Sequence, residues 1–165
     1  MLQPVVRRTW APRGQTPRLR QWDRHDRLSV VSALSVSPQR HRLGLCWEAH
    51  RDNLRTEQML AFLRALRRRQ ANGLILILDR WSVHRAAVRR LRKRSGRLQV
   101  EWLPSHAPEL NPVEQVWNHA KYTDLPNRTP RDIDELESLV QGSIAQTRSQ
   151  SQLLRSFFRT AKLKL

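Results

Sequence analysis

The chain of 165 residues has little cysteine and no long apolar run. Cys46 is the only cysteine, which excludes an internal disulfide and a cysteine-based zinc cluster. Because Cys46 follows Leu45 on an expected strand, we interpret it as a buried structural thiol. No apolar stretch approaches the roughly 20 residues that cross a bilayer, and no signal-peptide core is visible. We therefore expect a cytoplasmic protein without a membrane partner.

Acidic residues and lysines are also scarce. The chain has 31 basic and 14 acidic residues, and its formal net charge is +17. Four of the basic residues are lysine (Lys93, Lys121, Lys162 and Lys164), which leaves 27 arginines. Because the planar guanidinium grips phosphate with two donors, nucleic acid is the expected partner. An arginine-rich codon bias is the alternative, but bias alone does not explain why the acids are so outnumbered.

The first third of the chain predicts a β-hairpin. Residues 5–10 are typical of a short strand, and residues 11–17 form a turn-rich loop. Residues 28–36 alternate between apolar and polar side chains, and residues 43–47 are their expected partner. The polar link at residues 37–40 suits an antiparallel hairpin.

A helix and then a βαβ unit are expected next. The helix starts at Thr56, a good N-cap, and stops at Asn72-Gly73. The uninterrupted apolar run at residues 74–78 predicts a strand buried on both faces. A helix from Ser82 and a strand at residues 98–102 follow, so the two strands should be parallel.

The remaining residues predict three further helices. One begins around Glu114 and runs to Tyr122, and residues 126–130 break it with two prolines. The other two carry apolar stripes, the first of Ile133, Leu136, Val140 and Ile144 and the second of Leu153, Leu154, Phe157 and Phe158.

Two acids stand at positions that suit a catalytic carboxylate. Asp79 directly follows the apolar run, and sites in parallel sheets form at the carboxyl ends of strands. Glu114 lies 34 intervening residues later, where a strand gives way to a helix. Two such acids can converge on a divalent metal. Structural alternatives remain open, since Asp79 can cap a turn, and Asn111, Pro112 and Glu114 match a capping box.

The residues around both acids resemble a known family. Leu-Asp-Arg-Trp-Ser-Val-His at residues 78–84 and Leu-Pro-Ser-His-Ala-Pro-Glu-Leu-Asn-Pro-Val-Glu-Gln-Val-Trp at residues 103–117 are similar to DDE transposases of bacterial insertion sequences related to mariner elements. These transposases are DDE superfamily endonucleases. Residues 7–14, with Arg-Arg-Thr-Trp-Ala-Pro-Arg-Gly, match the family's segment after its first acid. The likeness is most specific over residues 74–121.

This resemblance implies a fold and a reaction. The fold would be α/β, with a ribonuclease H-like mixed sheet flanked by helices. Three acids would hold two Mg²⁺ ions, with Mn²⁺ as a substitute, and the ions would clamp both oxygens of a phosphoryl displacement. Water would free a 3′-hydroxyl at the element's end, and that hydroxyl would attack target DNA. Asp79 would be the second acid and Glu114 the third.

One departure from the family pattern concerns the first acid. In the family this acid precedes the equivalent of Gln3-Pro4, and Met1 lies just inside that point. We therefore expect an N-terminally truncated domain that lacks the first strand, one metal ligand and the helix-turn-helix that reads the element's end. Asp23, Asp26 and Asp52 are expected to be surface acids. The chain as written is then expected to be inactive, although it descends from an endonuclease.

The resemblance also implies an organisation and partners. Residues 1–125 would form the incomplete catalytic domain, and residues 126–165 a C-terminal helical extension. Double-stranded DNA, as transposon ends and as target, would be the partner, and the full-length active form is expected to be a homodimer. The DNA-binding candidates are Arg7, Arg8, Arg13, Arg80 and His84. Two interpretations of His84 stay open, a local hydrogen bond and a place beside a phosphate. The alternative function is a non-catalytic, sequence-nonspecific DNA-binding remnant or inhibitor.

Overall fold

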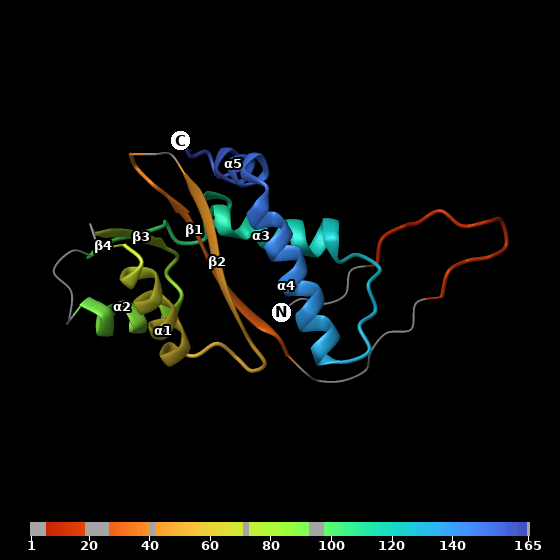
Figure 1. Cartoon of the computed structure of the whole chain (residues 1–165), viewed down its shortest axis with the longest axis horizontal. Coiled ribbons are helices and arrows are strands. Elements are labelled where there is room, and N and C mark those ends of the chain that lie inside the picture. The colour runs from red at the N-terminus through yellow and green to blue at the C-terminus, as the bar shows by residue number, and fades with distance from the viewer. Residues whose placement is uncertain (1–5, 19–26, 40–41, 71–72, 93–97, 165) are drawn as a thin grey trace.

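The computed structural model describes residues 6–18, 27–39, 42–70, 73–92 and 98–164. In these residues the strands form two separate two-stranded sheets, and helices pack around them (Figure 1). No helix among them is long and apolar enough to cross a membrane.

The predicted hairpin is confirmed. β1 (Ser29–Val36) pairs antiparallel with β2 (Leu43–His50), and Leu34 lies opposite Leu45. The amide of Ser37 donates to the carbonyl of Arg42 at 2.9 Å, which closes the link between the strands.

The βαβ unit is confirmed as well. β3 (Leu74–Leu78) pairs in parallel with β4 (Leu98–Trp102), and α2 (Ser82–Arg92) connects them. The prediction that β3 is buried on both faces is wrong. Ile75 and Ile77 are 62% and 58% exposed, because no described element covers the face of β3 from which they project.

A first core lies between the helices α1 (Thr56–Arg68) and α2 and one face of both sheets. Its buried side chains come from β1, α1, β3, α2 and β4; they are Val31, Met59, Leu60, Phe62, Leu63, Leu76, Ala87, Val88, Leu91 and Val100. The predicted bounds of α1 need correction. The N-cap is Arg55 rather than Thr56, and the helix ends at Arg68, before the expected Asn72-Gly73. Gly73 has φ of 115°, which favours glycine.

A second core covers the other face of the β1–β2 sheet. α3 (Pro112–His119), α4 (Ile133–Ser149) and α5 (Ser151–Thr160) supply it. The 3₁₀ turn η1 (Pro108–Leu110) leads into α3, and the π-helical segment η2 (Ala120–Asp124) follows it. The buried side chains of this core are Leu28, Leu45, Val116, Val140, Ile144, Leu154 and Phe157.

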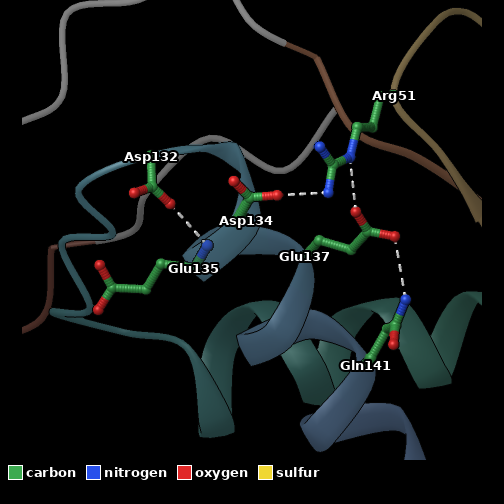
Figure 2. Close-up of polar contacts among 6 residues, drawn as sticks. All are labelled: Arg51, Asp132, Asp134, Glu135, Glu137 and Gln141. Atoms are coloured by element: carbon green, nitrogen blue, oxygen red, sulfur yellow. Dashed lines mark hydrogen bonds and ion pairs between the residues drawn. The ribbon is translucent and has the colours of Figure 1, made fainter.

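A charged cluster ties the first turns of α4 to the end of β2 (Figure 2). Arg51, just after β2, donates from Nε to Glu137 at 2.8 Å and from Nη2 to Asp134 at 2.5 Å. These two hydrogen bonds raise the pKa of Arg51. Asp132 caps α4 by accepting from the amide of Glu135 at 2.8 Å. The second core is therefore closed at its edge by specific polar contacts as well as by packing.

The short strand expected at residues 5–10 does not form in the part that the structure describes. Residues 6–10 have no regular secondary structure and are exposed, and the rest of the expected strand lies outside the described residues. The amide of Arg7 donates to Asn127 Oδ1 at 2.8 Å, so this segment is held by a loop contact and not by a sheet.

Candidate functional site

Asp79 lies in the short link between the carboxyl end of β3 and the start of α2. Its Oδ1 accepts the backbone N–H of Trp81 at 3.0 Å and lies 2.6 Å from Nδ1 of His84. The first contact is an Asx-type turn that redirects the chain from strand to helix. Asp79 is 45% exposed whereas His84 is 16% exposed, so a half-open carboxylate is held by a largely buried imidazole.

The neighbouring residues fix this edge of the sheet. Leu103, just past β4, donates its amide to the carbonyl of Leu78 at 2.8 Å, which extends the pairing of β3 with β4. Arg80 donates from Nε to the carbonyl of Leu103 at 3.2 Å. The Trp81 ring lies edge-on to the His84 ring, with centroids 5.3 Å apart. The link that carries Asp79 is therefore restrained on both sides.

Glu114 lies in the first turn of α3, and the predicted helix start is confirmed. Asn111 Oδ1 accepts the amide of Val113 at 3.2 Å, and Pro112 occupies the first helical position. In a capping box the amide of Asn111 would be directed to Glu114. Here that amide donates instead to the carbonyl of Pro108 at 3.0 Å. Asn111 alone accounts for the cap, and the capping interpretation of Glu114 does not hold.

The pKa of Glu114 is raised. Burial raises the pKa of Glu114, and the negative charge of Asp79 raises it further. A charge effect of this kind requires the two groups to be neighbours, because water screens exposed charges beyond about 10 Å. The two acids come from different elements, and their convergence on a metal ion stays a prediction.

A third ligand does not join this pair in the part of the chain that the structure describes. No group of three or more His, Cys, Asp or Glu side chains there has a geometry that could hold a metal ion. Asp52 is an exposed acid 3.6 Å from Arg55 Nη2. Asp23 and Asp26 lie outside the described residues.

The DNA-binding candidates fall into two groups. Arg80 and His84 flank Asp79, as described above. Arg7, Arg8 and Arg13 lie in the exposed segment at residues 6–18, which Figure 1 shows far from β3 along the longest axis of the molecule. The structure therefore does not bring these three arginines to the carboxylate pair.

The sequence interpretation missed a set of arginines beside the site. Arg85, Arg89 and Arg92 of α2 line a groove together with Arg80 and Trp102. Their spacing of four and three residues places them on one face of the helix, and this spacing can be seen in the sequence. Trp102 packs against the first core and also lines this groove.

The fold is α/β, with Asp79 at the carboxyl end of β3 and Glu114 in the first turn of α3. The chain belongs to the DDE superfamily endonucleases, because the model of that family matches residues 1–137. Members of this family typically use a divalent metal ion.

A solved structure shares the fold. The crystal structure of the Mos1 strand transfer complex is similar, with a TM-score of 0.59 and 13% sequence identity. The match covers 98% of this chain and 47% of that one, so the chain spans about half the length of its structural relative. This likeness shows a mixed α/β, ribonuclease H-like fold. No curated protein matches the chain.

Proposed function

We propose that this chain is the catalytic part of a transposase of a bacterial insertion sequence, which cuts and joins DNA strands. The observation that carries the proposal is the neighbouring pair of Asp79 and Glu114 in a chain that belongs to the DDE superfamily endonucleases. The solved relative is a strand transfer complex, which supports the same reaction class.

Asp79 and Glu114 would hold Mg²⁺, with Mn²⁺ as a substitute. Both ions prefer hard carboxylate oxygens, so the donor chemistry fits. Burial, and then the charge of Asp79, raise the pKa of Glu114, and a bound cation would offset both effects. When bound, such ions stabilise charge on phosphoryl oxygens and activate the attacking oxygen.

The chain's own residues orient the two carboxylates. The Trp81 amide and His84 Nδ1 both contact Oδ1 of Asp79, which leaves Oδ2 free to face a ligand. The Asn111 cap fixes the first turn of α3 and therefore the direction in which Glu114 leaves the helix. Both acids are thus positioned by contacts that exist without substrate.

We propose that the family's first acid, with the strand that carries it, lies outside the described residues. The β1–β2 and β3–β4 sheets are separate, yet Val31 of β1 and Leu76 of β3 share one core. A strand between β1 and β3 would join them into one mixed sheet. Cleavage would need this third acid as well as Asp79 and Glu114.

Double-stranded DNA is the proposed partner, as transposon ends and as target. The charge of +17 supports this partner, since arginine contacts to phosphate supply most of the affinity of nonspecific DNA binding. We also propose that residues 126–165 form a helical extension of a catalytic domain at residues 1–125, and that the active form is a homodimer.

A second function fits one observation. Because no third acid joins Asp79 and Glu114 among the residues described, the chain could serve only to hold DNA, as a remnant or an inhibitor. Such a protein would bind duplex DNA without sequence preference, and its affinity would fall steeply as salt rises.

Titration with Mn²⁺, followed by electron paramagnetic resonance, tests the proposal. We expect wild-type protein to bind Mn²⁺ and Asp79→Asn and Glu114→Gln each to weaken binding about tenfold or more, since each removes one of few charged ligands. Asp52→Asn removes an exposed acid away from the pair and is the matched control. Undiminished Mn²⁺ binding in both site variants would contradict the proposed site.

A plasmid-nicking assay with Mg²⁺ or Mn²⁺ separates the two functions. We expect the isolated chain to bind plasmid DNA without nicking it. Nicking that Asp79→Asn and Glu114→Gln abolish would show that the chain as given is catalytically active and needs both acids. DNA binding without any Mn²⁺ binding would favour the remnant or inhibitor instead.

A further inference from the structure

The arginines of α2 divide into two groups by what they face. Arg90 donates to Glu57 of α1 at 2.8 Å, so its charge is paired with an acid. The others lie along a groove of about 460 Å³ whose lining contains no acid; it is formed by Arg80, Arg85, Val88, Arg89, Arg92 and Trp102.

The spacing of the groove arginines matches a phosphate backbone. Arg85, Arg89 and Arg92 are four and three residues apart, which places them one above another on the same helix face. At 1.5 Å per residue, this row is about 10 Å long. A row of this length can contact more than one phosphate of a single strand.

The groove is built on rigid supports. Val88 is buried in the first core, and Trp102 packs against that core from β4. The arginine stems therefore project from a fixed helix over an apolar floor. Low-dielectric walls strengthen the attraction between guanidinium groups and an anion, and a preformed site loses less entropy when it binds.

The groove opens at the same edge of the sheet as the carboxylate pair. Arg80 is the residue after Asp79, and its Nε donates to the carbonyl of Leu103 beside Trp102. An anionic chain lying along α2 would therefore end next to Asp79. A free phosphate would occupy one such position, whereas a polymer would use the whole row.

We propose that this groove binds the phosphate backbone of a DNA strand and leads it to Asp79 and Glu114. The inference rests on the proposed function, because that function supplies DNA as the partner. Guanidinium groups that contact only phosphates read no bases. The groove would therefore add affinity for DNA and orient the strand toward Asp79, without sequence preference. Arg90, on the same helix, takes no part.

Fluorescence anisotropy with a labelled duplex of about 20 base pairs tests this. The protein is used metal-free, in EDTA, at NaCl concentrations from about 50 to 200 mM, where phosphate contacts dominate the salt dependence. The groove variant is Arg85→Gln with Arg89→Gln. The control is Arg68→Gln with Arg90→Gln, which removes the same charge from exposed positions outside the groove.

We expect the groove variant to bind about tenfold or more weakly, and its slope of log affinity against log salt to fall by about two, since each phosphate contact contributes ~0.9. The control should lose about threefold or less. Arg85→Lys with Arg89→Lys keeps the charge but not the two-donor fork, so its affinity should be intermediate. Thermal melts by circular dichroism confirm that every variant is folded.

Equal losses in the groove and control variants would overturn the inference, because net charge alone would then explain binding. Displacement of the DNA by duplex RNA at a lower concentration would overturn the choice of DNA. If the groove variant binds normally while Mn²⁺ binding persists, only this inference fails. If wild-type protein binds no duplex even at low salt, the DNA partner of the proposed function fails with it.

Discussion

The two sheets differ in how they are covered. β1–β2 has helices on both faces, with Val31 in the first core and Leu45 in the second. β3–β4 buries Leu76 and Val100 on one face, and on the other Ile75 and Ile77 are more than half exposed. Asp79 follows the sheet that is covered on one side. We therefore expect β1–β2 to contribute more to stability, while Asp79 lies at the edge of the less buried pair of strands.

The sharpest test of this contrast is a pair of truncations. Leu45→Ala in β2 should lower the free energy of unfolding by about 2–5 kcal/mol, because the side chain is fully buried among three helices. Ile77→Ala in β3 should cost less than about 1 kcal/mol, since more than half of the side chain already faces solvent. Urea denaturation of both variants measures the difference. Equal losses would mean that something covers the outer face of β3 in solution.

A substitution in α4, one of the helices that cover β1–β2, is expected to raise the free energy of unfolding, by a smaller amount. Gly142 lies inside this helix, and a Cβ there would have no atom within 4 Å. Gly142→Ala should therefore raise the free energy of unfolding by about 1 kcal/mol, the usual gain in helix propensity. Gly44→Ala in β2 is the control, because its Cβ would lie 2.7 Å from Ser35 Oγ. A thermal melt that showed no gain for Gly142→Ala would contradict the open environment of this glycine.

The smallest expected change is in how the stability of the protein depends on pH, and it is caused by Glu114. Glu114 has a pKa raised by burial and by the charge of Asp79, so the folded protein binds its proton more tightly than the unfolded chain does. Wild-type stability should therefore fall as pH rises from the unfolded pKa through the raised folded pKa. Glu114→Gln removes this loss.

Melting temperatures of wild type and Glu114→Gln between about pH 3 and pH 7 check the sign. The two proteins should be alike at the acid end, where Glu114 is protonated in both states. The variant should become the more stable one as pH rises. A variant that is less stable at neutral pH would show that Glu114 is held by a favourable partner instead.

Local signals predict much of this fold. Alternation predicts the β1–β2 hairpin, the strand–helix–strand pattern predicts the parallel pairing of β3 with β4, and Asn111-Pro112 predicts the start of α3. The exposed face of β3 could not be predicted in this way. An apolar run looks the same whether or not another element covers it, because coverage is a property of the tertiary fold.

In the candidate site, too, some features can be predicted from local sequence and others depend on the tertiary fold. Asp79 and Glu114 follow from their positions at a strand end and a helix start. The positions of Arg7, Arg8 and Arg13 do not follow, because an extended segment carries no signal of the surface it contacts. The arginine row on α2 resembles any solvated helix face in sequence, and its groove is visible only once Trp102 of β4 lies beside it.

The two acids are anchored in different cores. Asp79 follows β3, whose Leu76 belongs to the first core, and Glu114 lies on α3, whose Val116 belongs to the second. The two acids can therefore come together only when both cores have packed. A half-folded or proteolysed molecule would display two isolated acids with ordinary affinities. A metal site built on Asp79 and Glu114 would therefore depend on the packing of both cores.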